Sequence, residues 1–254
     1  MAGTPKTAVV TGASAGIGAA TARALAVAGF RVYLGARREG RLEELAQEIS
    51  ALPGSAGAVA LPLDVADGAS VDAFAAQVPE LRLLVNNAGA AFGVAKVEEA
   101  TDADWTAMWE INVLGVLRTT RAFLPKLLAS GDGHVINLGS IAGFETYVGG
   151  GGYTGTKHAV RALSRTLRLE LLGKPVRVTE IDPGLVETEF SRVRYGGDLE
   201  RAKAVYQGLT PLKSEDVADA VVWAATRPSH VDIDEIVMRP RDQATAWAVH
   251  RRQE

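Results

Sequence analysis

Tyr153 and Lys157 lie four residues apart in the stretch YTGTKHAVRALSRTLRLEL, whose pattern predicts a helix. At this spacing both side chains lie on one face of the helix, one above the other. Ser140 lies thirteen residues before Tyr153 and ends the run HVINLGS, whose apolar residues predict a buried strand. A hydroxyl, a phenol and an ammonium can therefore converge at one place and form a site for proton transfer.

The pKa of the tyrosine decides whether such a site works near neutral pH. A free tyrosine has a pKa of about 10, which is too high for proton exchange near neutrality. A neighbouring ammonium favours the phenolate, and a shift of ~3 units needs roughly 4 kcal/mol of differential interaction. We expect a desolvated contact between Lys157 and Tyr153 to supply this energy. The pattern Y-x-x-x-K fits a surface pair on one helix face equally well, so other motifs must decide.

The composition narrows the possible partners. The 254 residues carry a net charge of −3, so no positive surplus favours nucleic acid or a membrane surface. The absence of cysteine excludes disulfides, thiolate metal sites and cysteine nucleophiles, and it suits the cytoplasm. No apolar run reaches the ~20 residues of a membrane helix, and the start MAGTPKTAVV is too polar for a signal peptide. We expect a cytoplasmic protein that acts on a small molecule without a metal.

Segments typical of strands and of helices alternate along the chain, and no composition shift indicates a domain boundary. Such alternation produces a parallel sheet with helices on both faces and right-handed crossovers. We therefore predict an α/β fold, a doubly wound parallel sheet of about seven strands in a single domain, 1–254. The expected strands are 7–11, 31–36, 58–63, 82–86, 134–138, 175–181 and 232–238. The first expected helix follows the glycines after the first strand and stops at Gly29. The other expected helices span 39–50, 69–77, 102–129 (one or two helices), 152–172 and 216–226.

One connection is much longer than the others. Residues 184–213 join the sixth strand to the next helix over roughly thirty residues, where ~4–6 are usual. Connections of this length are usually lids or binding segments, so we predict a substrate lid with a short helix at 199–206 and a hinge at Gly196 and Gly197. Arg192 or Arg194 would bind an acidic group of the substrate; solvated arginines, or arginines paired within the segment, are the alternative. Residues 240–254 are expected to form a C-terminal tail.

Three glycines follow the first strand directly and precede a helix. They are Gly12, Gly16 and Gly18, in the pattern G-x-x-x-G-x-G. Glycines allow a tight turn and let a pyrophosphate approach the amides at the helix N-terminus. A lone glycine triplet also fits an ordinary turn, but the strand before it and the helix after it favour dinucleotide binding and a Rossmann-type fold.

The ends of the next strands add candidates for cofactor binding. The second strand ends in GARR, without the acid that would bind the adenine ribose of NAD. Arg37 and Arg38 offer forked donors suited to a 2′-phosphate, and Ser14 can add a hydroxyl, so we predict NADP(H). Two solvated arginines at a helix start are the alternative. Asp64 fits an adenine contact or a helix cap, and Asn86–Gly89 fits a ribose contact or a turn.

Together these motifs resemble the short-chain dehydrogenase/reductase family over essentially the whole chain. The resemblance favours the catalytic interpretation of Tyr153 and Lys157 over a surface pair. The matching residues are Thr11–Gly18 (TGASAGIG), Asp64, Asn86–Gly89 (NNAG), Asn112 in INVLG, Ser140, Tyr153, Lys157, Pro183, Gly184 and Thr188.

The resemblance implies a role for each matching residue. Tyr153 would be the general acid or base, Ser140 would hold the substrate oxygen, and Lys157 would bind the nicotinamide ribose and lower the pKa of Tyr153. Asn112 would anchor a water that relays protons to Lys157. The cofactor would contact Gly12, Ser14, Ala15, Gly16, Ile17, Gly18, Arg37, Arg38, Asp64, Val65, Asn87, Ala88, Gly89, Tyr153, Lys157, Pro183, Gly184, Val186 and Thr188.

The resemblance also implies a homo-oligomer, a tetramer or a dimer. The segment 102–129 is apolar on more than one face, and a helix of this kind needs a second burial partner. Its apolar residues include Leu114, Leu117, Phe123, Leu124, Leu127 and Leu128.

The last third of the chain is similar to the NADP-dependent 3-hydroxy acid dehydrogenases, which include serine and allo-threonine dehydrogenases and malonic semialdehyde reductases. This similarity implies a small 3-hydroxy acid or its semialdehyde as substrate. Glu145 and Asp182, acids near the site, favour the alternative, a carbonyl reductase of secondary metabolism. The glycine-rich run Gly149–Gly152 is expected to alter the wall of the pocket. A non-catalytic nucleotide-sensing protein is a third hypothesis, which the intact set of Asn112, Ser140, Tyr153 and Lys157 disfavours. The narrower similarity rests on Glu189–Tyr195, Gly197, Asp198, Tyr206, Pro211, Leu212, Glu215–Ala218, His230–Ile233, Arg239, Pro240 and Gln243.

Overall fold

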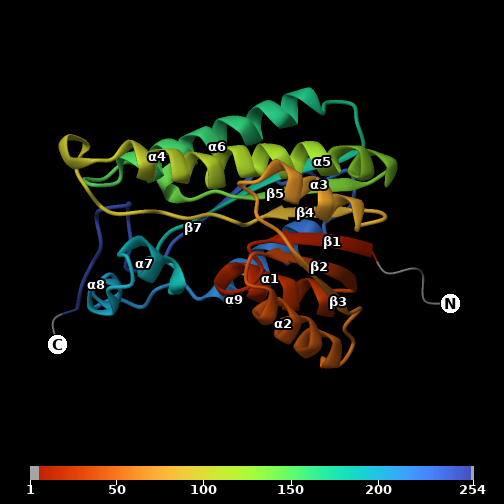
Figure 1. Ribbon diagram of the computed structural model, residues 1–254, viewed down its shortest axis with the longest axis horizontal. Coiled ribbons are helices and arrows are strands. Elements are labelled where there is room, and N and C mark those ends of the chain that lie inside the picture. Colours follow the sequence, from red (N-terminus) through yellow and green to blue (C-terminus); the bar gives the residue numbers. More distant parts are fainter. Residues whose placement is uncertain (1–5, 253–254) are drawn as a thin grey trace.

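A computed structural model describes residues 6–252 of the chain. Its centre is a seven-stranded parallel sheet with the strand order β3-β2-β1-β4-β5-β6-β7 (Figure 1). The order changes direction between β1 and β4, where the chain crosses from one half of the sheet to the other. The strands are β1 Lys6–Thr11, β2 Phe30–Ala36, β3 Ala58–Pro62, β4 Leu83–Asn86, β5 Gly133–Leu138, β6 Val176–Pro183 and β7 Glu235–Met238.

Helices cover both faces of the sheet, because each pair of parallel strands needs a crossover that packs on one face or the other. Figure 1 shows α3, α4, α5 and α6 on one side and α1, α2 and α9 on the other. The helices are α1 Gly16–Val27, α2 Glu39–Ala51, α3 Gly68–Ala76, α4 Asp102–Trp109, α5 Gly115–Ala129, α6 Gly151–Glu170, α7 Glu189–Arg194, α8 Leu199–Ala204 and α9 Ser214–Ala225, with the short segments η1 Val97–Glu99, η2 Glu110–Leu114 and η3 Ile141–Gly143.

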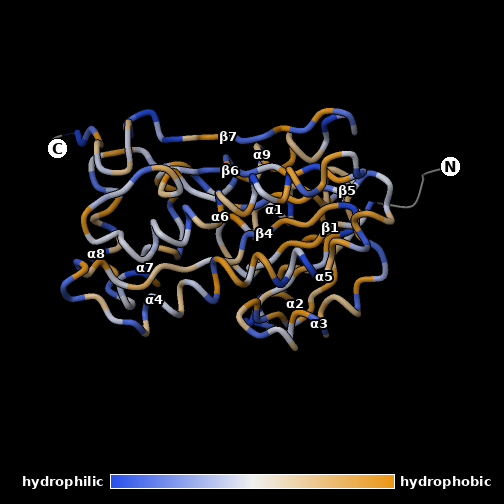
Figure 2. The backbone as a smooth tube through the Cα atoms, turned by 90° about the horizontal axis from the view of Figure 1, so that it is seen from above, coloured by the Kyte–Doolittle hydropathy of each residue, from blue (hydrophilic) through white to orange (hydrophobic). Residues whose placement is uncertain are grey.

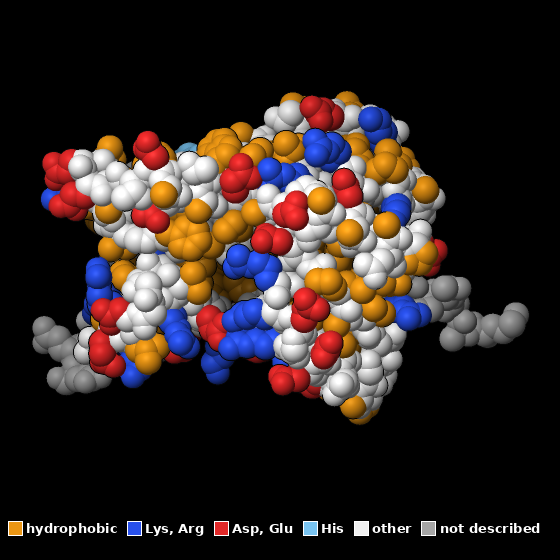
Figure 3. All heavy atoms as spheres, in the orientation of Figure 1, with side chains coloured by type: hydrophobic (Ala, Val, Ile, Leu, Met, Phe, Trp, Pro, Cys, Tyr) orange, Lys and Arg blue, Asp and Glu red, His pale blue; other side chains and the backbone are white. Residues whose placement is uncertain are grey.

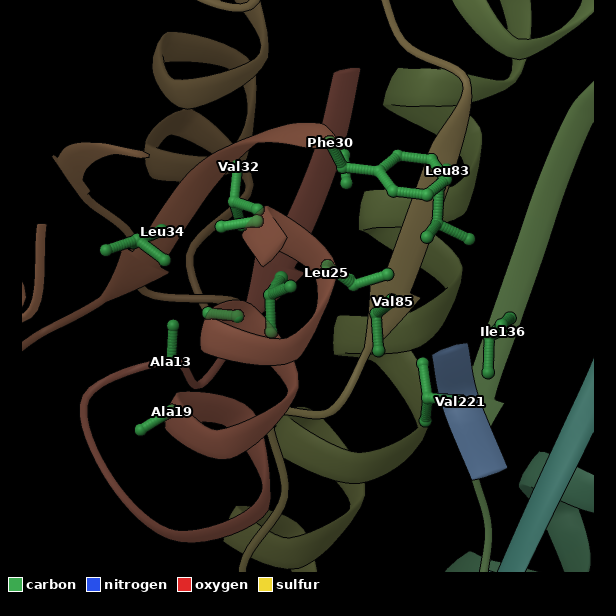
Figure 4. Packing of buried hydrophobic residues seen from close by; sticks show 14 of the residues in the cluster. Ala13, Ala19, Leu25, Phe30, Val32, Leu34, Leu83, Val85, Ile136 and Val221 are labelled. Atoms are coloured by element: carbon green, nitrogen blue, oxygen red, sulfur yellow. The ribbon is translucent and has the colours of Figure 1, made fainter. Parts of the chain in front are cut away.

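Two hydrophobic clusters, one on each face of the sheet, hold the layers together. In the first, Leu25 of α1 and Val221 of α9 pack with Val85 of β4 (Figure 4). In the second, Phe74 of α3 and Phe123 of α5 meet edge to face with their ring centroids 6.0 Å apart. Each fully buried side chain of this size contributes ~1.5–3 kcal/mol to folding. The middle of β1, residues 8–10, and most of β4, residues 83–85, are apolar (Figure 2), as expected where both faces are covered.

The structure confirms the predicted fold class, a doubly wound parallel sheet in a single domain. β7 begins at Glu235 instead of residue 232, because the carboxylate of Asp232, and not its backbone, accepts the bond from the Val178 N–H of β6 (3.2 Å). The predicted helix 102–129 consists of α4, η2 and α5 in direct succession, and η2 is a π-helical turn.

The segment 184–213, which we call the lid segment, holds two short helices instead of the one predicted. Thr188 caps α7 by accepting a hydrogen bond from the Phe190 N–H (3.2 Å). The carboxylate of Asp198 caps α8. Between these helices, Gly196 and Gly197 have φ angles of +62° and +94°, a left-handed conformation that favours glycine.

The segment predicted as a C-terminal tail is in contact with the domain in the part that the structure describes. Residues 240–252 pack back onto the domain: Gln243 is buried, and the Arg252 N–H donates to the Gly208 carbonyl of the lid segment (2.8 Å). Residues 253–254 lie outside the described range. These contacts make the C-terminal segment part of the structure around the lid.

Within residues 6–252, no helix combines the length and hydropathy that a membrane crossing needs. In the same range, no group of His, Asp and Glu side chains is arranged to hold a metal ion.

Candidate active site

Ser140, Tyr153 and Lys157 lie together at the carboxyl end of β5. Ser140 caps η3, where its Oγ accepts a hydrogen bond from the Ala142 N–H (3.1 Å). α6 carries both Tyr153 and Lys157, and the Lys157 Nζ donates to the Leu138 carbonyl at the end of β5 (2.7 Å). Ser140, Tyr153 and Lys157 all line one cavity. Their individual chemical roles stay predictions.

The cavity has a volume of about 940 Å³ and lies beyond the carboxyl ends of the strands, where the strand order changes direction. Open α/β sheets bind their ligands at such a place. Figure 3 shows a hollow near the centre of the molecule with Lys and Arg side chains at its rim. The other predicted cofactor residues that line the cavity are Gly12, Ser14, Ala15, Gly16, Ile17, Arg37, Arg38, Asp64, Val65, Asn87, Ala88, Gly89, Pro183, Gly184, Val186 and Thr188.

Gly18 and Asn112 are the predicted residues that do not line the cavity. A Cβ at Gly18 would lie 2.5 Å from the Asn87 Nδ2, so this glycine permits close packing instead of facing a ligand. The Asn112 Oδ1 accepts from the Ala90 N–H (2.8 Å), and its Nδ2 donates to the Ala90 carbonyl (2.8 Å) and the Thr156 Oγ1 (3.0 Å). Because both amide hydrogens are engaged, a water relay at Asn112 would have to use its backbone.

The glycine turn between β1 and α1 fits the pyrophosphate of a dinucleotide. Gly12 and Gly16 have φ angles of +65° and +55°, and a Cβ at Gly12 would lie 2.8 Å from the Ala88 Cα. Only glycine lets the backbone turn here so close to the residues after β4. The N-cap of α1 is Ala15, whose side chain cannot cap the first backbone N–H groups. These groups and the positive end of the helix dipole therefore suit an anion in the cavity.

The arginines at the end of β2 form an ion cluster with the lid segment. Arg38 donates from Nε to the Ser14 Oγ (3.0 Å) and from Nη1 to the Glu189 carboxylate (2.8 Å). Arg41 donates to the same carboxylate (3.0 Å), and the two arginines hold the pKa of Glu189 below its usual range. The sequence predicts no contact between Arg41 and Glu189, because they lie 148 residues apart and meet only in the fold.

Asp64 and Asn87 stabilise backbone turns in the cavity wall. The Asp64 Oδ1 accepts from the Ala66 N–H (3.0 Å) and so closes a turn before α3, whereas the cap of α3 is Asp67. The Asn87 Nδ2 donates to the Thr11 carbonyl at the end of β1 (2.9 Å). Both residues thus have a structural task in addition to the cofactor contacts that the sequence predicts.

The pKa of Tyr153 shifts in the direction opposite to the one expected from the sequence. Burial raises it to about 12, against the weaker opposing effects of Ser140 and Arg194. The Lys157 ammonium donates to the Leu138 carbonyl and lies 5.8 Å from the centroid of the Tyr153 ring, and it does not offset the effect of burial on the pKa of Tyr153. Burial also lowers the pKa of Lys157, to about 8. Tyr153 therefore keeps its proton through the neutral range, which suits proton donation.

Arg194 of α7 brings positive charge into the cavity close to Tyr153. Its guanidinium lies 5.9 Å from the centroid of the Tyr153 ring, and its Nη1 donates to the Tyr147 hydroxyl (3.0 Å). Its Nε donates to the Gly93 carbonyl (3.3 Å). Arg192 is exposed and does not line the cavity. Of the two arginines predicted to bind an acidic group, only Arg194 lines the cavity. Its two hydrogen-bond partners, the Tyr147 hydroxyl and the Gly93 carbonyl, are uncharged.

Glu145 and Asp182, the acids that favoured a neutral substrate, do not face the cavity. The Glu145 carboxylate accepts from the Arg239 Nη2 (2.7 Å) and from the Ala246 N–H. Asp182 is fully buried and accepts from the Ser140 N–H (2.7 Å). Both carboxyl groups are engaged within the protein, so neither stands in the way of an acidic substrate.

The C-terminal segment completes the cavity wall, a contribution that no local sequence pattern predicts. Gln243 and Trp247 line the cavity together with Tyr147. The Gln243 Oε1 accepts from the Leu185 N–H (2.8 Å) and so holds the start of the lid segment. A signal was present in the similarity of Gln243 to the 3-hydroxy acid dehydrogenases, but no local pattern connects it to the cavity.

Comparison with known proteins gives a family and close relatives. The family model described as short chain dehydrogenase matches residues 6–196. An uncharacterized oxidoreductase of Mycobacterium tuberculosis is 57% identical over 241 residues, 95% of this chain and 93% of that protein. The NADP-dependent 3-hydroxy acid dehydrogenase of Schizosaccharomyces pombe is 41% identical over 259 residues, 98% of this chain and 97% of that protein. The chain belongs to the short-chain dehydrogenase family and is an oxidoreductase.

A solved structure agrees with this assignment. The closed form of serine dehydrogenase complexed with NADP+ matches with a TM-score of 0.90 at 40% identity, covering 97% of this chain and 100% of that one. The predicted resemblance to the family and to its 3-hydroxy acid dehydrogenases is thereby confirmed.

Proposed function

We propose that the protein is a cytoplasmic NADP(H)-dependent oxidoreductase that transfers hydride between the nicotinamide and a hydroxyl or carbonyl carbon. The observation that carries the proposal is one cavity lined both by Ser140, Tyr153 and Lys157 and by the glycine turn with the arginines of β2. The relative from S. pombe is named for NADP, and the serine dehydrogenase structure contains NADP+. Arg37 and Arg38 would hold the 2′-phosphate.

A bound nicotinamide supplies or accepts the hydride. In carbonyl reduction, the Ser140 hydroxyl holds the substrate oxygen, and the Tyr153 hydroxyl gives it a proton as negative charge develops there. The pKa of about 12 keeps that proton on Tyr153 until transfer. Lys157, fixed by its bond to the Leu138 carbonyl, orients the ribose. In alcohol oxidation the groups act in reverse, and Tyr153 must first lose its proton.

The proposed substrate is a small 3-hydroxy acid or its semialdehyde. The supporting observation is the charge of Arg194, whose hydrogen bonds go to the uncharged Tyr147 hydroxyl and Gly93 carbonyl. A guanidinium can clamp a carboxylate with two parallel hydrogen bonds. A neutral aldehyde or ketone, the substrate of the alternative carbonyl reductase, would leave this charge unmatched.

Turnover of a substrate panel tests the proposed function. Purified protein is mixed with NADPH and malonic semialdehyde or simple ketones, and with NADP+ and serine, threonine or other 3-hydroxy acids, while absorbance of NADPH is followed. We expect turnover of the acidic members in both directions. Binding of NADPH without turnover of any member would support the nucleotide-sensing hypothesis instead.

NADPH is expected to bind roughly ten- to a hundred-fold more tightly than NADH, because a charge-assisted contact to the 2′-phosphate contributes ~1.5–3 kcal/mol. Fluorescence titration gives both dissociation constants. Arg37→Asp should narrow or reverse the preference. Arg31→Asp, an exposed arginine near the other end of β2, serves as the matched control and should leave the ratio unchanged. Equal dissociation constants in the unmodified protein would refute the prediction.

We also propose a homo-oligomer, a dimer or a tetramer. Two of the apolar residues that suggested it, Phe123 and Leu127, are buried within the chain itself. Leu117 of α5 is 42% exposed, and Trp105 and Trp109 of α4 are 43% and 45% exposed. Their spacing in multiples of four places them along one side of the continuous helix, which needs a burial partner. Light scattering at micromolar concentration should give a multiple of 26.7 kDa, and a monomeric mass would contradict the proposal.

A further inference from the structure

Two buried carboxyl groups lie against the backbone that leads to Ser140. Asp182 and Glu180 are alternate residues of β6, so their side chains lie on the same face of the sheet, and both are at most 3% exposed. The Asp182 Oδ1 accepts from the Ser140 N–H at 2.7 Å. A Cβ at Gly139 would lie 2.0 Å from the Asp182 Oδ1 and 2.6 Å from the Glu180 Oε1. The backbone before Ser140 is therefore seated directly on both carboxyl groups.

One oxygen of each carboxyl group is poorly satisfied if both groups are ionised. The Asp182 Oδ2 and the Glu180 Oε1 are buried without a hydrogen-bond partner among residues 6–252. The nearest cation to Asp182 is Arg161, whose Nη1 is 3.7 Å from the Oδ2 while its Nη2 bonds Glu235 of β7 (2.8 Å). An unpaired buried charge is costly, and a proton shared between neighbouring carboxyl groups removes that cost.

Other charged groups around the pair come from two packed elements. α6 contributes Lys157, whose charge is favoured by both carboxylates, and Tyr153, whose ionisation Asp182 opposes. β7 contributes Glu235, which binds Arg161 and adds negative charge. Burial, followed by the charge of Glu180, raises the pKa of Asp182 to about 8. Burial raises the pKa of Glu180 too, so the two titrate as one unit.

We propose that Asp182 is a positioning residue for Ser140, and that Asp182 and Glu180 share one proton through the neutral range. Ser140 is then held at two atoms: its N–H by Asp182 (2.7 Å) and its Oγ by the Ala142 N–H (3.1 Å). This arrangement fixes where the hydroxyl meets the substrate oxygen, and so rests on the proposed function. A displacement of about 1 Å at a reacting group can cost about a hundredfold in rate.

Two substitutions of Asp182 and a matched control test the positioning role. Asp182→Asn keeps the acceptor for the Ser140 N–H, and its amide can donate to the Glu180 Oε1 as the protonated acid would. Asp182→Ala removes the acceptor. The control is Asp232→Ala, because the Asp232 carboxylate also accepts a backbone N–H of β6, that of Val178 (3.2 Å), at the end of the strand far from the cavity.

Steady-state kinetics at pH 7 should separate these variants. We expect Asp182→Asn to retain kcat close to that of the unmodified enzyme. Asp182→Ala should lose about ten- to a hundred-fold in kcat with little change in KM, because the hydroxyl is misplaced but the substrate pocket is intact. Asp232→Ala should lower the unfolding temperature without lowering kcat. Equal kcat in Asp182→Ala and the unmodified enzyme, or equal losses in Asp182→Asn and Asp182→Ala, would overturn the positioning role.

Thermal unfolding across pH tests the shared proton without any need for turnover. An unfolded aspartate binds a proton only below about pH 4, whereas the folded pair keeps one up to about pH 8. The folded state therefore binds more protons between these values, and this group makes the protein less stable as pH rises through that window. Asp182→Asn removes the titration, so its unfolding temperature should decline less between pH 5 and 8. Parallel declines would overturn the shared proton.

The two proposals fail in distinguishable ways. An unmodified enzyme that turns over no member of the panel refutes the proposed function, and the unfolding experiment still decides the shared proton. An active enzyme whose Asp182→Asn and Asp182→Ala variants behave alike refutes the positioning role and leaves the proposed function standing. If Asp182→Ala does not fold, the kcat of Asp182→Asn tests the positioning role by itself. A loss of kcat beyond tenfold in Asp182→Asn would overturn that role.

Discussion

Replacing Tyr153 with phenylalanine is expected to reduce carbonyl reduction by about 10²–10⁴-fold, the usual contribution of a general acid, while NADPH still binds. The substitution removes the hydroxyl that lies beside Ser140 and leaves the ring packed on Phe190 of the lid segment, 5.3 Å away between centroids. Loss of proton donation should therefore appear in kcat, with the dissociation constant of NADPH little changed.

Steady-state rates and a fluorescence titration of NADPH measure the two quantities separately. Tyr33→Phe is the matched control, since Tyr33 is a buried tyrosine of β2 that does not line the cavity. The pKa of Tyr153, which burial raises to about 12, predicts how the rate of each reaction direction changes with pH. Alcohol oxidation needs the phenolate, so its rate should rise with pH above neutrality, and reduction should not rise. Near-normal turnover by Tyr153→Phe would refute the mechanism.

Replacing Arg194 with alanine is expected to lower kcat/KM for a 3-hydroxy acid or semialdehyde by roughly ten- to a hundred-fold and to spare a neutral ketone. Arg194 lies beside Tyr153 and Tyr147 in the cavity, and its hydrogen bonds within the chain go to uncharged groups. A carboxylate would gain a charge-assisted pair there, and losing that pair costs ~1.5–3 kcal/mol for the acid alone.

The control for this experiment lies on the same short helix. Arg192 is exposed and outside the cavity, so Arg192→Ala changes the charge of the lid segment without touching the proposed carboxylate site. Arg194→Lys should restore part of the activity, because lysine keeps the charge but lacks the planar fork of donors. Equal effects of Arg194→Ala on acidic and neutral substrates would show that the lid does not recognise the carboxylate, and the carbonyl-reductase alternative would then be preferred.

Local patterns in the sequence were enough to predict the fold class. Apolar β-branched runs and amphipathic stretches alternate because each parallel strand is buried on both faces and each crossover helix on one. The glycine motif lies as predicted at the junction of β1 and α1, since a strand–turn–helix junction is encoded within a few neighbouring residues. The spacing of Tyr153 and Lys157 on one helix, with Ser140 at a strand end, likewise reports a short-range geometry. Their catalytic roles await the experiments above.

Tertiary structure alone decided the electrostatics and the long-range partners. The expected pKa of Tyr153 was wrong in direction, because desolvation depends on everything that packs around the ring and not on the neighbour four residues away. Arg38 meets Glu189 across 151 residues of sequence, and Asp182 meets Ser140 across 42. Which of Arg192 and Arg194 faces the cavity depended on how α7 packs beside it, and only Arg194 lines it. Periodicity specifies which face of an element is buried, but which side chains meet there, and how much water remains, is settled only when the elements pack.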